Sequence, residues 1–224
     1  MRQRLGTVFD WAKASGFRHG ENPVDGVSKG LPKQGDKDVH HAALPYQEVP
    51  SFISALRTHA GTDLARLAFE FLILTAARTG EVLGALREEI DHNNLLWTIP
   101  AYRMKAGVAH RVPLAPRCVD ILGRAVELTG NSRYLFPGRS SDVPMSNMVF
   151  LMILRRMRVN ATTHGFRSSF RDWAAETTNF PSEVAEMALA HRIDSKVEAA
   201  YRRGDLLEIR RVMMTDWAKY ISCA

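Results

Sequence analysis

A stretch rich in glycine, proline and charged residues divides the chain into two unequal parts. Residues 20–26 read Gly-Glu-Asn-Pro-Val-Asp-Gly, and residues 28–37 continue with Ser-Lys-Gly-Leu-Pro-Lys-Gln-Gly-Asp-Lys, a composition typical of interdomain linkers. One amphipathic helix is expected before this stretch, over residues 1–19, and a lone helix cannot bury its own apolar stripe. We therefore predict that residues 1–41 are the last helix of an upstream domain plus a linker, and that residues 42–224 form one domain.

The composition of the chain is that of a globular protein from a reducing compartment. Its 224 residues are 46% hydrophobic and 24% charged, which excludes a disordered or fibrous chain. Cys118 and Cys223 share no metal-ligand or redox spacing, so we expect free thiols and a cytoplasmic protein. The longest apolar run, residues 67–77, contains Glu70 and is too short for a bilayer, and the N-terminus lacks the apolar core of a signal peptide. We expect no association with a membrane.

From residue 44 onward the apolar residues recur mainly at helical spacing. Residues 95–100 and 110–114 differ, because they are β-branched or aromatic, limited by proline and connected through Gly107, which is a hairpin signature. The helical pattern covers residues 45–59, 62–77, 79–87, 116–128, 146–156, 163–177, 181–190, 195–202 and 206–221. The sequence predicts a mainly α (α+β) fold, a helical domain that carries a small antiparallel β-sheet or hairpin.

Positive charge is concentrated in two sections of the second part. The chain has 30 Lys and Arg against 24 Asp and Glu, a formal net charge of +6. Residues 102–117 and 151–171 hold nine of the basic residues and no acidic residue. Net charge alone does not separate a nucleic acid from a membrane surface. A localised basic patch, however, suits a phosphate backbone better than a diffuse positive surface would.

The helix expected over residues 163–177 has one cationic face. At about 100° per residue, His164, Arg167 and Arg171 fall within roughly 60° of one another. The opposite face is apolar and carries Phe166, Phe170, Trp173 and Ala174. One interpretation is a solvated basic face on an amphipathic helix. The other is an anion site, because His164 lies in the first turn, where free N–H groups and the helix dipole favour a bound phosphate.

A second candidate site follows the most apolar helix, in the sequence Ala-Ala-Arg-Thr-Gly-Glu of residues 76–81. Gly80 is expected to make a tight break before the next helix. An arginine at the end of a buried helix is held in place, so Arg78 can present its planar guanidinium to a phosphate. The competing interpretation is a plain ion pair between Arg78 and Glu81 that closes the helix. Glu81 fits both interpretations, since the same contact would orient the guanidinium.

Lys105 and Tyr201 are weak candidates when each is considered alone. Lys105 lies at the tip of the expected hairpin, where most lysines only solubilise a sheet edge. Tyr201 lies on a short expected helix beside Arg202 and follows His191 by ten residues. A tyrosine in such a position is usually a packing residue, so the sequence around it has to carry any further interpretation.

Taken in order, these segments resemble the catalytic domain of the tyrosine recombinases, and of phage-type integrases in particular. The segments are Ala-Arg-Thr-Gly-Glu, the hairpin lysine followed by His-Arg-Val-Pro-Leu, His-Gly-Phe-Arg, Leu-Ala-His and Ala-Ala-Tyr-Arg-Arg. The resemblance runs from residue 44 to about residue 221, and residues 1–26 resemble the final helix of the family's core-binding domain. It implies a site-specific DNA recombinase, an integrase that cleaves and rejoins strands through a 3′-phosphotyrosyl intermediate and integrates or excises a mobile element.

The resemblance also implies a role for each residue of the site. Arg78 and Arg167 match the two arginines that clamp the scissile phosphate. His164 matches a histidine that contacts the nucleophile or the phosphate, and His191 matches a residue that contacts a non-bridging phosphate oxygen. Glu81 is expected to support this set. The residues expected to bind DNA around it are Arg103, Arg111, Arg171 and Arg202.

Two further residues complete the implied chemistry. Lys105 matches the general acid for the departing 5′ oxygen, and Tyr201 matches the nucleophile. A free phenol with a pKa of about 10 is a weak nucleophile until cationic neighbours stabilise the phenolate. Arginine forks stabilise the charge that gathers on a phosphate under attack, so no metal and no cofactor is expected. The expected partners are double-stranded DNA attachment sites, further copies of the chain in a tetrameric synapse, and a directionality factor.

Three alternatives stay open from the sequence. A truncated integrase remnant would act only as a DNA-binding module without recombination. A metal-hydrolase site built from His40 and His41, or from His164 and His191, is disfavoured, because the spacing fits no standard ligand set and no paired carboxylates converge nearby. The apolar stripe of the last helix, over residues 206–221, packs either in cis or on a neighbouring protomer.

Overall fold

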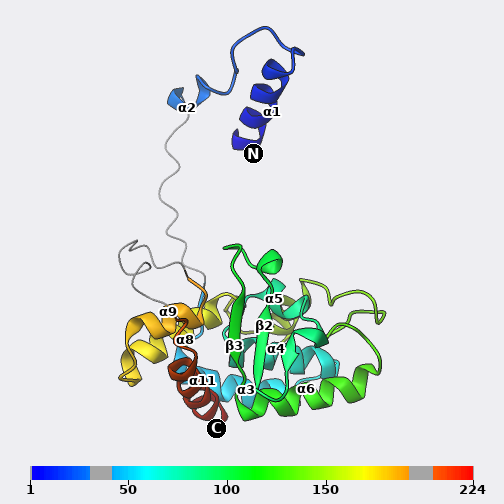
Figure 1. Cartoon of the computed structure of the whole chain (residues 1–224), viewed down its shortest axis with the longest axis vertical. Coiled ribbons are helices and arrows are strands. Elements are labelled where there is room, and N and C mark those ends of the chain that lie inside the picture. The colour runs from blue at the N-terminus through cyan, green and yellow to red at the C-terminus, as the bar shows by residue number, and fades with distance from the viewer. Residues whose placement is uncertain (1, 31–41, 192–203, 224) are drawn as a thin grey trace. The chain divides into compact units, whose positions relative to one another are not determined.

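A computed structural model describes residues 2–30, 42–191 and 204–223 of the chain (Figure 1). Its contacts divide the chain into two units, Met1–His40 and His41–Ala224. None of the helices in the described part combines the length and the apolar character needed to cross a membrane.

The first unit is built around the helix α1, Arg2–Ala14, which ends earlier than the predicted residue 19. The chain leaves the helix at Gly16, whose φ of +77° is a conformation that favours glycine. Buried Asn22 ties the following loop to α1 by side-chain hydrogen bonds. The apolar side of α1 stays at least partly exposed, Trp11 by 60%. A short helix, α2 at Val27–Gly30, lies within the segment predicted as linker.

The second unit is mainly helical, as the sequence predicts. The longer helices mostly begin and end within three residues of the predicted bounds, and the helix predicted over residues 195–202 lies outside the described residues. The helices are α3 Val49–Thr58, α4 Asp63–Thr75, α5 Thr79–Leu83, α6 Pro116–Thr129, α7 Val149–Arg156, α8 Gly165–Thr177, α9 Ser182–Ala188 and α11 Leu207–Ser222. Short 3-10 turns lie at η1 Tyr46–Glu48, η2 Arg87–Glu89 and η3 Ala101–Arg103.

The small antiparallel sheet has the strand order β1-β2-β3. Strand β2, Leu96–Ile99, pairs with β3, His110–Pro113, in the predicted hairpin, with Trp97 opposite Val112. Strand β1, Ile90–Asp91, was not predicted, because two residues are too short to show a strand periodicity. The sheet therefore extends the predicted hairpin by one edge strand.

The core is centred on α4, whose last turns are buried on every side. Phe69 of α4 stacks on Phe150 of α7, with ring centroids 4.9 Å apart. The last helix packs in cis, because α11 contacts α3, α4 and α9 of its own chain. Buried Trp217 of α11 packs on Trp173 of α8 and donates its indole N–H to the carbonyl of Ile73, at 2.9 Å. These contacts hold α4, α8 and α11 together beneath the candidate site.

The break after α4 falls at Ala76, and the predicted break at Gly80 is wrong. Ala76 has a φ of +48°, which ends α4, whereas Gly80 lies inside α5. The glycine suggested the turn because a positive φ is least costly for glycine. Here tertiary packing holds a buried alanine in that conformation. The turn leaves the carbonyl of Ala76 free of the α4 ladder and available to a side chain.

Candidate functional site

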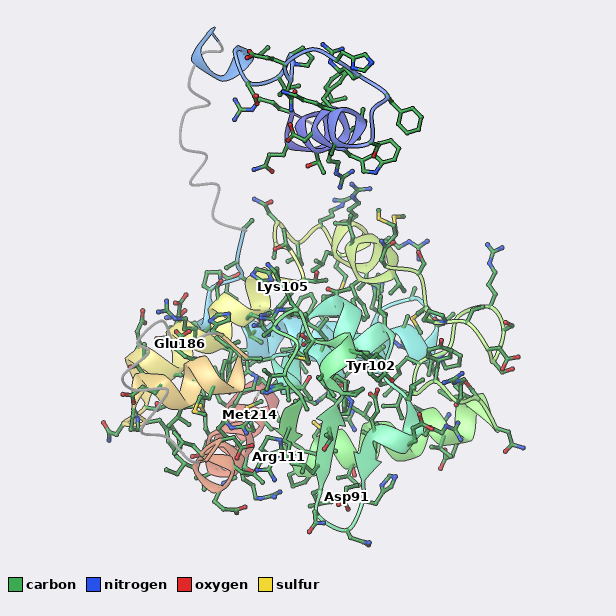
Figure 2. All side chains as sticks on the ribbon, turned by 45° about the horizontal axis from the view of Figure 1, so that its top comes forward. Asp91, Tyr102, Lys105, Arg111, Glu186 and Met214 are labelled. Atoms are coloured by element: carbon green, nitrogen blue, oxygen red, sulfur yellow. The ribbon has the colours of Figure 1, made fainter. Side chains whose placement is uncertain are left out.

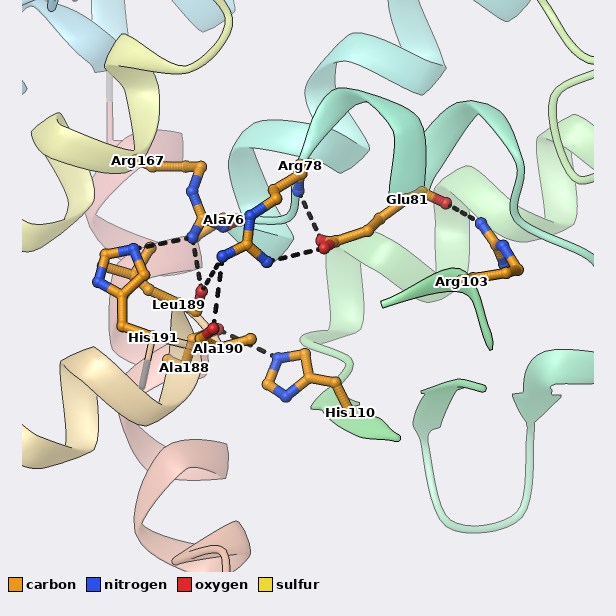
Figure 3. Close-up of polar contacts among 10 residues, drawn as sticks. All are labelled: Ala76, Arg78, Glu81, Arg103, His110, Arg167, Ala188, Leu189, Ala190 and His191. Atoms are coloured by element: carbon orange, nitrogen blue, oxygen red, sulfur yellow. Dashed lines mark hydrogen bonds and ion pairs between the residues drawn. The ribbon is translucent and has the colours of Figure 1, made fainter. Parts of the chain in front are cut away.

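Arg78 is held at the start of α5 by the carboxylate of Glu81 (Figure 3). Buried Glu81 accepts the backbone N–H of Arg78 and one N–H of its guanidinium, each at 2.8 Å. The other end of the guanidinium reaches the carbonyl of Ala190, at 3.3 Å. The contact between Arg78 and Glu81 satisfies both predicted interpretations, since it closes the turn and also orients the guanidinium fork.

Arg167 extends from α8 and is almost completely buried, with 3% of its surface exposed. Its guanidinium donates to the carbonyls of Ala76 and Leu189, at the ends of α4 and α9. Carbonyls at a helix C-terminus lack partners within the helix and attract cations. The solvated basic face predicted from periodicity is therefore wrong for Arg167, because two segments distant in sequence cover it.

The charge of Arg167 is compensated only in part, because Glu81 and Glu186 act on it by their charges but no carboxylate among the described residues bonds to it. Burial, reinforced by the positive charge of Arg78, lowers the pKa of Arg167 to about 10. Its Nε–H is buried and has no hydrogen-bond partner in the described part of the chain. Both guanidinium groups also share the carbonyl of Leu189 as an acceptor (Figure 3). The two arginines thus converge as a pair of like charges, an arrangement that favours a bound anion.

His191 is bonded between Arg167 and Glu186. Its Nε2 lies 3.2 Å from the Arg167 guanidinium and its Nδ1 lies 2.6 Å from a Glu186 carboxylate oxygen. Because a guanidinium only donates, Nε2 accepts and Nδ1–H donates to Glu186. The other carboxylate oxygen of Glu186 accepts from Arg171, at 2.6 Å. Burial raises the pKa of Glu186, but the bonds from His191 and Arg171 outweigh it and hold this pKa below its usual value.

His164 lies directly before α8 and is exposed. Its neighbour Thr163 is hydrogen-bonded to Thr79, next to Arg78, at 3.0 Å, which joins the starts of α5 and α8. The residue after His164 has to be a glycine, because a Cβ at Gly165 would lie 2.3 Å from the carbonyl oxygen of Ala42. The glycine of the His-Gly-Phe-Arg segment is therefore required by close backbone packing.

Lys105 and Tyr102 are both exposed in the segment between β2 and β3 (Figure 2). Gly107 of this loop has a φ of +68°, as expected of a hairpin glycine. Tyr201 and Arg202 lie outside the described residues, so their roles stay predictions.

Three of the arginines predicted to bind DNA are bonded to carboxylates. Arg103 pairs with Glu89, Arg111 with Asp205 at 2.7 Å, and Arg171 with Glu186 at 2.6 Å. The side chain of Arg103 is only 13% exposed, whereas those of Arg111 and Arg171 are 45% and 61% exposed. Exposed ion pairs are weak and can be exchanged for a phosphate, so DNA contact by Arg111 and Arg171 remains a prediction.

The sequence did not point to Glu186, Glu89, Asp205 or His110. Glu186 lies five residues before His191, but this spacing is no recognisable pattern, because His191 lies beyond the end of α9. His110 of β3 lies 3.2 Å from the carbonyl of Ala188 through Nε2 (Figure 3). Burial and the charge of Arg210 lower the pKa of His110 to about 4, so it is neutral at pH 7.

Comparison with known proteins identifies the family and the fold of this chain. The model of the Phage integrase family matches residues 43–206. Prophage integrase IntZ of Escherichia coli K12 is 33% identical over 223 residues, which cover 99% of this chain and 54% of the relative. The chain thus spans about half the length of the curated relatives it matches.

Two solved structures of lambda integrase have the same fold. One is a dimer bound to a COC′ core site, with a TM-score of 0.60 and 20% identity, covering 91% of this chain and 71% of that one. The other is a tetramer bound to a Holliday junction, with a TM-score of 0.61 and 17% identity, covering 91% of this chain and 60% of that one. At these identities the likeness shows the fold alone.

Proposed function

The chain belongs to the phage integrase family, and on that premise we propose that it cleaves and rejoins double-stranded DNA at specific sites through a 3′-phosphotyrosyl intermediate, so that a mobile element is integrated or excised. The observation that carries the proposal is the convergence of Arg78, buried Arg167 and His191 on one point, where the Arg167 Nε–H has no partner among the described residues. A phosphodiester supplies the negative charge and the acceptor oxygens that these groups lack.

The arginine pair acts on the equatorial oxygens of the scissile phosphate. Negative charge builds on these oxygens as the nucleophile attacks, and donors that are already oriented stabilise the transition state more than the ground state. Glu81 and the carbonyls of Leu189 and Ala190 hold the two guanidinium groups in place before the substrate arrives. His191 orients the Arg167 guanidinium, because its Nε2 accepts from that group while its Nδ1–H donates to Glu186. We propose that this set works without a metal ion.

In the proposed step, the phenol oxygen of Tyr201 attacks the phosphorus and the bond from phosphorus to the 5′ oxygen breaks. The phenol proton passes to the imidazole of His164, and the ammonium of Lys105 transfers a proton to the departing 5′ oxygen. The phosphotyrosyl bond then keeps the energy of the broken phosphodiester. A 5′ hydroxyl of the same or another strand reverses the step, so rejoining requires no nucleotide cofactor.

We propose that copies of the chain act together on DNA in the bacterial cytoplasm, at the nucleoid. The lambda integrase tetramer on a Holliday junction has the same fold and is the analogy for a tetrameric synapse. A directionality factor would then bias integration against excision. Residues 1–41 are proposed to be the last helix of a core-binding domain and its linker, and residues 42–224 to be the catalytic domain.

Covalent trapping tests the proposed reaction directly. Wild-type chain is incubated with nicked duplexes that span the attachment locus, and an SDS-resistant protein–DNA adduct is scored on a gel. Tyr201→Phe should abolish the adduct and leave duplex binding nearly unchanged, because only the attacking oxygen is removed. Tyr220→Phe is the matched control, since its hydroxyl bonds only weakly to the carbonyl of Tyr46, at 3.4 Å.

Two results would contradict the proposal in different ways. An adduct that persists in Tyr201→Phe means that another residue is the nucleophile. A wild-type chain that binds the duplex and never forms an adduct supports the alternative, a DNA-binding module without recombination. The half-length coverage of the relatives is the observation that keeps this alternative worth testing.

A further inference from the structure

Arg103 lies at the base of the hairpin, two residues before Lys105. Its guanidinium donates to both carboxylate oxygens of Glu89 and to the backbone carbonyl of Glu81. The Arg103 and Glu89 side chains are only 13% and 5% exposed, so the pair is largely removed from solvent. A largely buried arginine whose guanidinium is already bonded to a carboxylate and a carbonyl has little to offer to a DNA phosphate.

Glu81 connects this arginine to the arginine pair of the site (Figure 3). Its side chain holds the guanidinium and the backbone N–H of Arg78, and its carbonyl accepts from Arg103. One residue of α5 therefore contacts both arginines, one through its carboxylate and one through its main chain. A shift of Arg103 changes the position of the hairpin relative to the turn that carries Arg78.

The other contacts of Arg103 are built to hold it in place. Glu89 is fixed by the indole N–H of Trp97, at 2.9 Å, and by the backbone N–H of Leu86, at 3.3 Å. Gly84 leaves room for the guanidinium, because a Cβ at this position would lie 3.0 Å from the Arg103 Nη2 and 3.2 Å from a backbone carbonyl. Arg103 is thus enclosed by groups that cannot easily move.

The chain from Arg103 to Lys105 is short and ordered. Arg103 ends the turn η3, Met104 is buried with 7% exposed, and the Gly107 N–H donates to the Met104 carbonyl at 3.0 Å. Two residues span at most about 7 Å. The anchor at Arg103 therefore limits where the backbone of exposed Lys105 can lie.

We propose that Arg103 is a positioning residue, which ties the hairpin bearing Lys105 to the turn bearing Arg78 through Glu81 and Glu89. The proposal rests on the proposed function, in which the Lys105 ammonium protonates the departing 5′ oxygen. It also replaces the DNA contact predicted for Arg103. The ion pair between Arg103 and Glu89 sets the distance between Lys105, the proposed general acid, and Arg78, which binds the phosphate.

A change of leaving group separates positioning of the acid from general damage. When the 5′ oxygen of the scissile phosphate is replaced by sulfur, the phosphorus–sulfur bond breaks and the thiolate leaves with its electron pair. A thiolate is the conjugate base of a much stronger acid than an alcohol is, so its departure needs no proton from Lys105. A variant whose only defect is a missing or misplaced acid recovers on this substrate.

The experiment measures single-turnover cleavage of oxygen- and sulfur-bridged nicked duplexes by the full chain. Lys105→Ala and Arg103→Gln should both cleave the oxygen substrate about 100-fold more slowly than wild type, because general acid catalysis contributes at least this factor. Both should cleave the sulfur substrate within about threefold of wild type, and Glu89→Gln should behave as Arg103→Gln does. Arg57→Gln is the matched control, since Arg57 also pairs with a buried carboxylate, Glu70, which Arg117 continues to hold.

The outcomes separate the two proposals. If sulfur does not rescue Lys105→Ala, the acid assignment in the proposed function is wrong and this inference falls with it. If sulfur rescues Lys105→Ala and not Arg103→Gln, only the inference is overturned. Equal rates for Arg103→Gln and wild type on the oxygen substrate overturn it as well.

Hydrogen exchange provides a test that does not depend on cleavage. Arg103→Gln should increase amide exchange at Met104 and Gly107, whereas Arg57→Gln should leave the exchange of these amides unchanged. Unchanged exchange at Met104 and Gly107 in Arg103→Gln overturns the proposed anchor.

Discussion

Arg167 and Arg210 are both almost completely buried, yet the structure treats their charges differently. Arg210, 1% exposed, donates from Nη2 to the Asp205 carboxylate at 2.8 Å, from Nε to the Asp205 carbonyl and from Nη1 to the Arg111 carbonyl. Arg167, 3% exposed, has carbonyls and an imidazole as partners, and among the described residues no carboxylate pairs with it. Burial lowers the pKa of both groups. Asp205 opposes this effect at Arg210 through its charge and a direct hydrogen bond, whereas Glu81 and Glu186 oppose it at Arg167 through their charges alone.

The two arginines differ in how their buried charge is compensated within the chain. Removing an ion from water costs several kcal/mol, and a buried ion pair recovers this cost only through good geometry and further hydrogen bonds. Arg210 has that compensation within the chain, where it links β3 to the start of α11. No carboxylate among the described residues bonds to Arg167, and a bound anion is the compensation that we propose for it. We therefore propose that the substrate binds in the region around Arg167.

Substituting Arg167 should mainly reduce cleavage, whereas substituting Arg210 should mainly reduce stability. Arg167→Gln should reduce single-turnover cleavage by about 1,000-fold, because charge that matters most in the transition state is lost. Its free energy of unfolding should fall by only about 1 kcal/mol, since a charge that is only partly compensated leaves with the hydrogen bonds. Arg210→Gln should instead lower that free energy by about 2 kcal/mol, because its bonds to Asp205 and to the carbonyl of Arg111 are lost.

Cleavage assays and urea unfolding of the two variants check this contrast. Equal losses of stability would show that the two arginines have the same structural role. If Arg210→Gln reduced cleavage as much as Arg167→Gln does, the argument that Arg167 acts on the substrate would fail.

The pKa of His110 depends on the positive charges of both arginines. Its pKa is about 4 because of burial, the charge of Arg210 and, to a smaller extent, the charge of Arg167, whereas an unfolded histidine has a pKa of about 6.5. The unfolded state binds the proton first as the pH falls, so stability is lost between about pH 6.5 and pH 4, by about 2.5 kcal/mol at pH 4.5. His110→Gln should remove this part of the pH dependence.

Urea unfolding of both proteins at pH 7, 5.5 and 4.5 gives the comparison. His92→Gln is the control, because His92 is exposed in the turn between β1 and β2. A wild-type profile in His110→Gln would contradict the burial argument. A rise of the His110 pKa in Arg210→Gln, followed by NMR, would sharpen it.

Glu186 is linked to Arg167 only indirectly, whereas Asp205 bonds to Arg210 directly. Glu186 bonds to His191, and His191 bonds to Arg167. Glu186→Gln keeps an acceptor for the Nδ1–H of His191 and removes the negative charge beside it. Outer contacts that orient a functional histidine are worth about tenfold or more, so single-turnover cleavage should fall by about tenfold while unfolding changes little. Glu183→Gln, on the same helix, is the control. Unchanged cleavage in Glu186→Gln would show that the contact with His191 has no functional weight.

Arg171 should give the smallest effect. Its pair with Glu186 is exposed, so Arg171→Gln should change the free energy of unfolding by less than about 0.5 kcal/mol. If Arg171 exchanges Glu186 for a DNA phosphate, the slope of log K against log salt should fall by about one. Arg124→Gln, with a comparably exposed pair on α6, should leave the slope unchanged. A wild-type slope in Arg171→Gln limits this arginine to its contact with Glu186.

Local patterns predicted the elements of the second unit well. Apolar residues at helical spacing located α4 and α8 to within two residues, and proline and glycine delimited the β2–β3 hairpin. The failures were also local in origin. A strand of two residues has no detectable period, and Gly80 was a plausible turn residue although packing placed the positive φ at Ala76.

The site residues were less predictable than the elements. Motifs identified Arg78, Arg167 and His191, and these three come together in space. The same reasoning assigned Arg103 to DNA, because Glu89, its partner 14 residues earlier, does not appear in any local pattern. Glu186 was missed for a related reason, since its contact with His191 depends on how the chain leaves α9.

Order and spacing along the chain were sufficient to identify the helical domain, the hairpin and the family's motifs, because periodicity and turn preferences act between near neighbours. Order and spacing do not show which buried arginine lacks a bonded carboxylate among the described residues. That property depends on carboxylates brought close from far along the chain, as Asp205 is brought to Arg111 across 94 residues. Electrostatic compensation is set by distance in space and by burial, and both arise only when the chain has folded.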